Sequence, residues 1–265
     1  MSPLKAEDIS AASDFLGSLS RSGRHGEAIP PAYRPQTRED GYAIQAQCEK
    51  WSAKPLWGWK IAATSIAGQK HINVDGPLAG RLIAEGVAPE GAPVALATNR
   101  MQVAEIEFVF RMGRALPPRS TPYSCDEVMA SVAALHLGVE IPDSRYLDFV
   151  SAGAAQLIAD RACAHLFVLG GEVAAAWRER DLSACAVQGR TSAGVTHDGG
   201  GANVLGDPRI ALTWLANELG AHGVTLGKGQ FVTTGACVAP LPISPGDVVT
   251  GDYGPFGSLQ VRFEA

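Results

Sequence analysis

The chain has 265 residues, 46% of them hydrophobic and 18% charged, enough to bury a full core in one large domain or in one domain with an appendage. Its net charge of −5 and the lack of a basic cluster argue against nucleic acid and anionic membrane as partners. The five cysteines are scattered without a Cys-x-x-Cys pair, and no signal sequence or bilayer-spanning run is visible, so we expect a cytoplasmic protein without disulfides or a zinc knuckle.

Residues 1–56 are predicted to form a helical N-terminal flank. Thr37 and the acidic residues that follow it resemble a capped helix start, and three apolar residues then share one helical face. The Pro- and Gly-rich segment 23–35 is a connector from an earlier helix. We expect residues 57–265 to form a β-rich catalytic core.

The first expected strand, 57–63, carries Lys60 in an apolar stretch. An unpaired ammonium is costly there, and burial lowers the pKa of a lysine, whereas nearby carboxylates support its charge. Lys60 is therefore a candidate catalytic group, as a proton donor or as an anchor for a substrate carboxylate. The alternative is a lysine whose charged end reaches the surface.

Asp75 precedes Gly76 and Pro77. An acid before Gly-Pro is most often a turn residue, because its short side chain hydrogen-bonds to the nearby backbone. The alternative is a catalytic role for Asp75 as a proton shuttle near the substrate.

After a short expected strand at 93–97, the hydrophobic stretch 103–110 is interrupted by Glu105 and Glu107. Side chains alternate along a strand, so both acids share one face, with Cα atoms roughly 7 Å apart at about 3.3 Å of rise per residue. Two carboxylates this close in an apolar setting repel unless they are protonated or bridged by a cation. An exposed edge strand would solvate them, but the apolar neighbours on both faces favour a central strand.

A third acid, Glu140, follows Glu107 by 33 residues in another apolar segment. Between them, Ser124 and Glu127 form a capping box, which predicts a helix that continues through Leu135. The order strand, helix, strand can bring all three acids together. Three carboxylates with room for water and substrate suit Mg²⁺ or Mn²⁺ better than zinc.

Two charged residues, Asp143 and Arg145, follow Glu140 closely. They could hold a substrate carboxylate or orient the metal ligands, and Arg145 is a candidate catalytic residue on that basis. A purely structural Asp–Arg pair is equally consistent with the sequence.

The remaining chain is predicted to contain a strand at 164–173, a helix that starts at Asp207-Pro208 and stops at Gly220, and strands at 231–234 and 258–263. The Gly-rich segment 194–206 is predicted to be a long loop that could close over the site. It lacks the Lys-Ser/Thr and the strand-to-helix context of a phosphate loop. No serine elbow or cysteine–histidine pair supports nucleophilic hydrolysis.

Several ordered motifs between about Ala43 and Phe263 resemble the fumarylacetoacetate hydrolase superfamily, in its branch of 2-oxopent-4-enoate hydratases and 4-oxalocrotonate decarboxylases. These motifs are Gly58 to Ser65, Glu105 to Glu107, Val139 to Arg145, Val204 to Pro208 and Pro245 to Val249. The resemblance implies an α+β fold, with a mixed β-roll core and a helical N-terminal part. It also implies Mg²⁺ or Mn²⁺ held by three acids, which by motif position are Glu105, Glu107 and Glu140.

Three segments depart from the pattern of the hydratases. Leu78-Ala79-Gly80 replaces an acid-aromatic-Gly run, Asp160-Arg161-Ala162-Cys163 replaces Asp-Asn-Ala-Ser, and Thr234-Gly235-Ala236 stands where Ser-Gly-Ser is frequent. Each change removes or alters a polar group that could touch the substrate. We therefore expect the metal site to be kept and the substrate pocket to be altered.

The activity implied by the resemblance is that of a metal-dependent hydratase, a lyase that adds water to a short 2-hydroxy-2,4-dienoate. A dication that binds the 1-carboxylate and the 2-oxygen would polarise the 2-oxo group and stabilise an enolate. The same site could serve a decarboxylase of a 4-oxalocrotonate-type 2-oxo acid or an acylpyruvate hydrolase. A non-catalytic partner subunit of such an enzyme is a further alternative.

Members of this family commonly assemble into symmetric homo-oligomers, so we expect a homo-oligomer that acts on a small-molecule 2-oxo acid. The apolar surroundings of Trp51, Trp57 and Trp59 suit either a subunit interface or the core.

Overall fold

The computed structural model describes residues 3–265. Its α-helices are α1 Ala6–Ser22, α2 Arg38–Ala46, α3 Ile66–His71, α4 Cys125–Met129, α5 Ala154–Ala159 and α6 Pro208–Ala221. Its strands are β1 Gly58–Ala62, β2 Leu78–Leu82, β3 Val87–Pro89, β4 Val94–Ala95, β5 Val103–Met112, β6 Val132–Ile141, β7 Leu166–Glu172, β8 Ala186–Thr191, β9 Thr196–Gly200, β10 Phe231–Ala236, β11 Leu241–Pro242, β12 Val248–Asp252 and β13 Ser258–Glu264.

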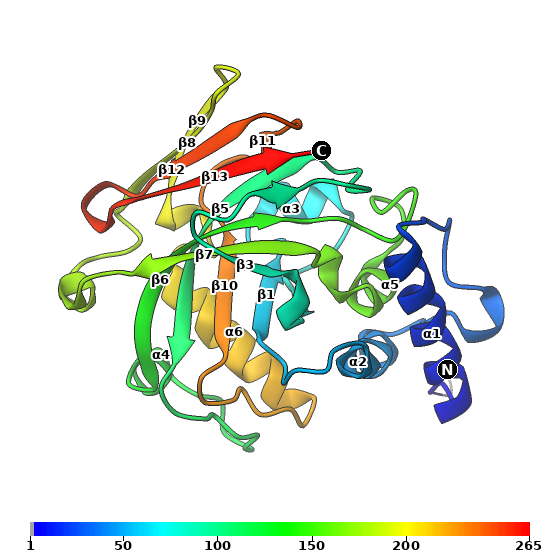
Figure 1. The fold of residues 1–265 in the computed structure, drawn as a ribbon. Coiled ribbons are helices and arrows are strands. Elements are labelled where there is room, and N and C mark those ends of the chain that lie inside the picture. The colour runs from blue at the N-terminus through cyan, green and yellow to red at the C-terminus, as the bar shows by residue number, and fades with distance from the viewer. Residues whose placement is uncertain (1–2) are drawn as a thin grey trace.

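The strands form two curled sheets of mixed direction. The larger has eight strands in the order β2-β1-β10-β5-β6-β7-β3, with β11 paired to β5, and the smaller has five in the order β4-β13-β12-β8-β9. In Figure 1 the smaller sheet lies across one end of the larger one, and α6 packs against β10. The predicted α+β fold with a mixed β-roll core is confirmed.

Strand β5 is central, as its apolar neighbours predicted, with β10 and β11 on one side and β6 on the other. Its Ile106 and Phe108 are fully buried on the face opposite the acids. The smaller sheet approaches this face so closely that a Cβ added to Gly251 would lie 2.9 Å from Ile106 Cγ2. This close contact of the two sheets leaves the acid-bearing face of β5 free to line a site.

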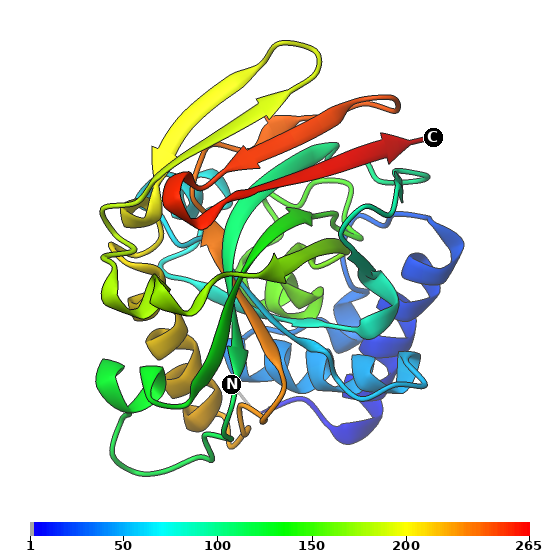
Figure 2. The same ribbon diagram turned by 60° about the vertical axis from the view of Figure 1, so that its left-hand side comes forward.

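The N-terminal part is helical, and Figures 1 and 2 show α1 and α2 beside the larger sheet, away from the smaller one. Thr37 caps α2 by accepting a hydrogen bond from the Asp40 N–H at 3.2 Å, as predicted. A small second core joins Leu16 and Ile44 of these helices to Tyr146 of the β-rich part. The division at residue 56 stays a prediction.

The prediction of a helix from Ser124 through Leu135 is correct for the first turn and wrong for the residues beyond it. The capping box of Ser124 and Glu127 is present, but α4 ends at Met129 and β6 begins at Val132. The apolar spacing of Val132 and Leu135 fits a buried strand as well as a helix, and the sheet contacts decide between them. As a result, β6 is a long strand directly antiparallel to β5.

The predicted loop 194–206 is also wrong in part, because its first half is β9, the edge strand of the smaller sheet. Here the glycines serve close packing: a Cβ on Gly199 would lie 2.2 Å from the carbonyl oxygen of Cys237. The helix that follows is confirmed as α6, with Asp207 accepting from the Arg209 N–H at 2.7 Å.

Of the three tryptophans considered for an interface, Trp59 is fully buried, whereas Trp51 and Trp57 are half-buried. A core role therefore holds for Trp59. Within residues 3–265 no helix has both the length and the apolar character needed to cross a bilayer.

Candidate functional site

The three predicted acids converge on one face of the larger sheet. Glu105 lies directly opposite Glu140 in the antiparallel pairing of β5 with β6, and Glu107 is two residues along β5 on the same face. Each of the three offers a carboxylate oxygen, and these oxygens all lie within 4.8 Å of one another. The alternation of side chains along β5 thus produces the predicted cluster.

Glu107 is the most firmly held of the three. Its Oε2 accepts hydrogen bonds from the Thr233 hydroxyl and, at 2.8 Å, from the Gly235 N–H, whereas its Oε1 has no hydrogen-bond partner among residues 3–265. The hydroxyl of Tyr253, which directly follows β12, donates to the carbonyl of Gly138 at 2.7 Å and accepts from the Glu107 N–H at 3.1 Å. One carboxylate oxygen is therefore fixed and the other is available to a ligand.

Glu140 is fully buried. Its Oε1 lies 2.9 Å from Lys60 Nζ, and its Oε2 accepts no hydrogen bond from the described residues. Glu105 is only half-buried because its side chain faces a cavity. A buried carboxylate oxygen without a hydrogen-bond partner costs free energy, so each such oxygen indicates a position where a ligand would bind.

The electrostatics of the cluster point the same way. Burial, followed by the charges of Glu140 and Glu105, raises the pKa of Glu107 well above its usual value. Burial also raises the pKa of Glu140 to about 7, although Lys60 opposes this. When all three carboxylates are ionised, the one ammonium leaves two negative charges uncompensated. A divalent cation with a preference for oxygen ligands fits this donor set in both charge and chemistry.

Lys60 lies on β1, between β10 and β2, and its side chain is 4% exposed. Its Nζ donates a hydrogen bond to the carbonyl oxygen of Ala162 at 2.9 Å besides pairing with Glu140. Burial alone would lower the pKa of Lys60, but Glu140 and Glu105 outweigh it and raise the pKa. The carboxylates therefore have a larger effect on the pKa of Lys60 than burial does, and the Lys60 ammonium is charged.

The carbonyl that holds Lys60 belongs to a strained turn. Arg161, Ala162 and Cys163 have φ of 56°, 51° and 63°, three consecutive non-glycine residues in the left-handed region. Gly80 of β2 leaves room for this turn, because a Cβ there would lie 2.1 Å from the Arg161 carbonyl oxygen. The segment Leu78 to Gly80 differs from the hydratase motif at its first two positions, but it retains Gly80, the residue that the turn requires.

Arg145 is not brought to the cluster. Its guanidinium is buried, with Nε donating to Asp160 Oδ1, Nη2 to the Asp160 carbonyl at 2.7 Å and Nη1 to the Ala164 carbonyl at 3.0 Å. Asp160 Oδ2 in turn accepts from the Ser144 hydroxyl at 2.9 Å. This favours the structural alternative for Arg145, with Asp160 rather than Asp143 as its partner.

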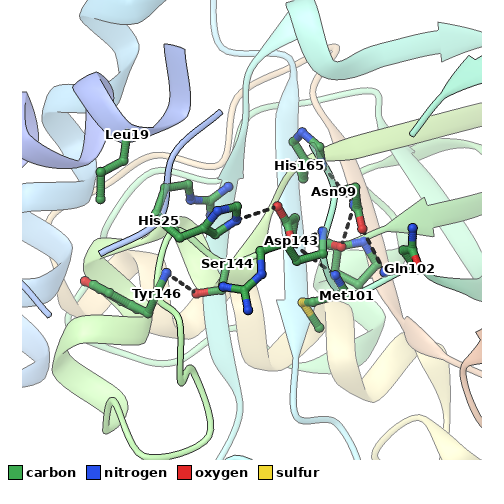
Figure 3. A network of polar contacts seen from close by, with 12 residues as sticks. Leu19, His25, Asn99, Met101, Gln102, Asp143, Ser144, Tyr146 and His165 are labelled. Atoms are coloured by element: carbon green, nitrogen blue, oxygen red, sulfur yellow. Dashed lines mark hydrogen bonds and ion pairs between the residues drawn. The ribbon is translucent and has the colours of Figure 1, made fainter. Parts of the chain in front are cut away.

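Asp143 instead anchors the loop before β5 (Figure 3). Its Oδ1 accepts from the N–H groups of Arg100 at 3.1 Å and Met101 at 3.3 Å, and its Oδ2 lies 3.3 Å from His25 Nε2. Asn99, in the same loop, contacts His165 Nδ1 at 3.1 Å. Because Met101 lines the cavity, Asp143 acts on the site by holding a part of its wall.

Asp75 is also apart from the cluster. Its side chain is 92% exposed, lies 3.7 Å from Arg38 Nη1, and does not line the cavity. This placement fits a turn acid better than a proton shuttle.

The half-buried Glu105 opens onto a cavity of about 720 Å³. Lys60, Cys163 and uncharged polar residues are found in its walls, and the rest of the lining is largely apolar. Of the histidines, His71 lies in this lining, whereas His165 does not. Thr234 points to the opposite face, where its hydroxyl donates to the Phe108 carbonyl at 3.0 Å.

Several residues that shape the site were missed from the sequence. Thr233 and Tyr253 position Glu107, and the carbonyl of Ala162 holds Lys60. Thr233 had a usable signal, since alternation along an apolar strand places it on the opposite face from Thr234. The roles of Tyr253 and Ala162 depend on contacts between distant segments and left no local signal.

Comparison with known proteins finds relatives of two kinds, 4-oxalocrotonate decarboxylases and 2-keto-4-pentenoate hydratases. The chain is 29% identical over 234 residues, 87% of each chain, to a 4-oxalocrotonate decarboxylase of Pseudomonas sp. (strain CF600). It is 30% identical over 260 residues, 96% of each chain, to 2-keto-4-pentenoate hydratase 1 of Dechloromonas aromatica. No family model matches the chain.

The fold is also similar to a solved structure over nearly its whole length. The 4-oxalocrotonate decarboxylase from Pseudomonas putida G7, complexed with magnesium and adipate, matches with a TM-score of 0.89 and 26% identity, covering 99% of this chain and 100% of that one. The same enzyme has also been solved with calcium and acetate. Both complexes contain a divalent cation and a carboxylate, which agrees with a divalent metal at the three acids.

Proposed function

Because the chain belongs to the fumarylacetoacetate hydrolase superfamily, in its branch of 2-oxopent-4-enoate hydratases and 4-oxalocrotonate decarboxylases, we propose that it is a metal-dependent hydratase of a 2-hydroxy-2,4-dienoate. The observation that carries the proposal is the cluster of three carboxylates beside a charged lysine, with Glu105 and Lys60 in the wall of the cavity. The reaction adds water to the diene to give a 4-hydroxy-2-oxo acid.

Glu105, Glu107 and Glu140 would hold the divalent ion, and we propose Mg²⁺ or Mn²⁺ because all three ligands are carboxylates. When bound, such an ion supplies Lewis-acid polarisation of the substrate's 2-oxygen. The orphaned Oε1 of Glu107 and Oε2 of Glu140 support this assignment. Thr233 and the Gly235 N–H keep Glu107 aimed at the site, since they occupy its other oxygen.

Lys60 would act on the substrate as a hydrogen-bond donor. With its pKa raised it stays protonated at neutral pH, so it is suited to hold the substrate carboxylate or to deliver a proton, and not to act as a base. Its second contact, to the Ala162 carbonyl, fixes the direction of the ammonium. The Arg145–Asp160 pair would act on the site indirectly: it holds the strained turn that contains Ala162, and the Ala162 carbonyl in turn positions Lys60.

The decarboxylase alternative is favoured by one observation, the similarity to a decarboxylase over almost the whole chain. Both reactions require charge to be stabilised at the same 2-oxygen. They differ in the bond that breaks: water adds across a double bond in the hydratase, whereas a carboxylate leaves as carbon dioxide in the decarboxylase.

We also propose a symmetric homo-oligomer. Support comes from two large apolar side chains, Leu147 and Ile210, which are each 51% exposed in the single chain. Sedimentation velocity over a range of concentrations tests the proposal, and a monomer throughout that range would contradict it.

The proposed activity is tested by incubating the purified protein with 2-hydroxypenta-2,4-dienoate and, separately, with 4-oxalocrotonate. We expect loss of the diene absorbance with Mg²⁺ or Mn²⁺, no loss after chelation, and a 4-hydroxy-2-oxo acid as product. Release of carbon dioxide from 4-oxalocrotonate as the faster reaction would favour the decarboxylase. Metal binding without turnover on either acid would favour a non-catalytic partner subunit.

A further inference from the structure

Away from Glu105 and Lys60, the walls of the cavity are apolar. They come mainly from the end of α3, from β2, from α5 and from the segments before α5 and after β10, with Ile72, Leu78, Leu157, Phe149 and Val238 among the larger apolar side chains. Besides His71 and Cys163, the other polar side chains in the lining, Thr64, Ser65 and Asn203, are uncharged. A ligand that extends from the acids into this space therefore meets hydrocarbon on several sides.

The cavity has little positive charge to offer a second anion. Lys60 and His71 are the basic side chains in its lining within residues 3–265. Lys60 Nζ is already shared between Glu140 and the Ala162 carbonyl, each at 2.9 Å. The exposed His71 packs its ring against Phe149, with the ring centres 6.0 Å apart. A second carboxylate at the far end would therefore lose its hydration without gaining a strong cationic partner, which costs free energy.

The cavity is also large for the shortest dienoates. Its volume of about 720 Å³ falls in the range of about 300–1,000 Å³ that is usual for sites that bury drug-sized ligands. A five-carbon acid anchored at the three carboxylates would leave much of the apolar wall in contact with water. Burying that wall against additional carbon atoms is favourable.

We propose that this cavity selects acids with a single carboxylate, at the metal end, and an uncharged apolar tail longer than that of a five-carbon dienoate. The proposal deepens the proposed function and rests on it for the position of the carboxylate. It excludes acids with a second carboxylate at the far end as preferred ligands.

Binding can be separated from turnover by using saturated 2-oxo acids, which carry the carboxylate and the 2-oxygen but no diene. Calorimetry in saturating Mg²⁺ would compare 2-oxobutanoate, 2-oxopentanoate and 2-oxohexanoate with 2-oxoadipate, the dicarboxylate with the same six-carbon chain as 2-oxohexanoate. We expect affinity to rise about fourfold for each added carbon. We expect 2-oxoadipate to bind at least about tenfold more weakly than 2-oxohexanoate.

A pair of variants on α3 and its end tests whether the lining sets this preference. Ile72 lies in the lining, whereas Ile66 is 67% exposed and lies outside it. We expect Ile72→Arg to tighten 2-oxoadipate binding relative to 2-oxohexanoate, because it adds a cation to the apolar wall. The matched control Ile66→Arg adds the same charge to the same region and should keep the wild-type preference.

Equal or tighter binding of 2-oxoadipate by the wild-type protein overturns the inference, as does affinity that does not change with tail length. A shift in Ile66→Arg as large as that in Ile72→Arg overturns the role of the lining. If the binding series holds while no dienoate is turned over, the proposed hydratase activity fails and the selectivity stands. If dienoates are turned over but 2-oxoadipate binds more tightly than 2-oxohexanoate, the proposed selectivity is contradicted and the proposed hydratase activity stands.

Discussion

Two buried clusters of charge lie close together in this protein and differ in one respect. In the first, Arg145 and Asp160 satisfy each other, and neighbouring backbone groups take up their remaining donors and acceptors. In the second, the carboxylates of Glu107 and Glu140 are equally buried but keep oxygens without a partner. Complete pairing is what a structural ion pair requires, whereas orphaned oxygens that point at one spot indicate a place for a ligand.

The largest expected effect comes from removing a charge in the incomplete cluster. Glu107→Gln should abolish both Mg²⁺ binding and turnover, because the amide lacks the charge that the divalent ion requires. The fold should stay intact, since the variant also removes a like-charge repulsion with Glu140 and Glu105. Calorimetry with Mg²⁺, the dienoate assay and circular dichroism provide the checks. Retention of full activity would count against the metal assignment.

The next effect concerns the complete cluster. Arg145→Met should reduce the free energy of unfolding by about 3–5 kcal/mol, because it leaves the carboxylate of Asp160 buried and unpaired. Urea denaturation measures this loss. At temperatures where the variant is folded, its Mg²⁺ affinity should stay near the wild-type value. A variant of normal stability that has lost turnover would instead make Arg145 a catalytic residue.

Thr233 and Thr234 allow the two faces of β10 to be compared directly. Thr233→Val removes the hydroxyl that donates to Glu107 and should weaken Mg²⁺ binding by about 10–100-fold. Thr234→Val removes a hydroxyl that donates to the Phe108 carbonyl on the other face and should leave Mg²⁺ binding unchanged. Equal Mg²⁺ affinities of the two variants would show that Glu107 does not need Thr233.

The metal-free protein should become less stable as pH rises. The folded-state pKa of Glu140 is raised from 4.5 to about 7, so its favourable contribution is present below about pH 4.5 and is lost as pH rises toward 7. Mg²⁺ must displace these protons, so its affinity should weaken about tenfold per pH unit and per proton below pH 7. Thermal unfolding with and without Mg²⁺ between about pH 4.5 and 8 measures both trends. Stabilisation by Mg²⁺ that does not grow with pH would be inconsistent with buried carboxylate ligands.

The smallest effect is expected at Asp75. Because its side chain is 92% exposed and outside the cavity, Asp75→Asn should change kcat/KM by less than about twofold, in line with surface substitutions generally. Steady-state kinetics on the dienoate provides the measurement. A drop of tenfold or more with unchanged stability would restore the proton-shuttle role.

The parts of the site that sequence predicts are those that depend on local periodicity. Alternation along β5 placed Glu105 and Glu107 on one face, and the apolar surroundings of Lys60 indicated its burial. The caps at Ser124 and Asp207 fixed where two helices begin, because capping uses residues only two or three positions apart. Glu140 was found as an acid in a second apolar segment, and the family motifs agreed with it as the third acid.

The parts that sequence does not predict depend on contacts between distant segments. The partner of Arg145 is Asp160, fifteen residues away, and nothing in the motif distinguishes it from Asp143. The end of α4 at Met129 is decided by the pairing of β6 with β5, since Val132 and Leu135 fit either structure. The left-handed turn at Ala162 is imposed by its surroundings, because alanine does not favour that conformation.

The most direct measurement is the position of a bound metal. Crystals grown with Mn²⁺ would reveal the ion by its anomalous scattering. The account predicts one strong peak per chain, about 2.0–2.2 Å from an oxygen of each of Glu105, Glu107 and Glu140. A peak elsewhere, or none at these three acids at saturating Mn²⁺, would contradict it.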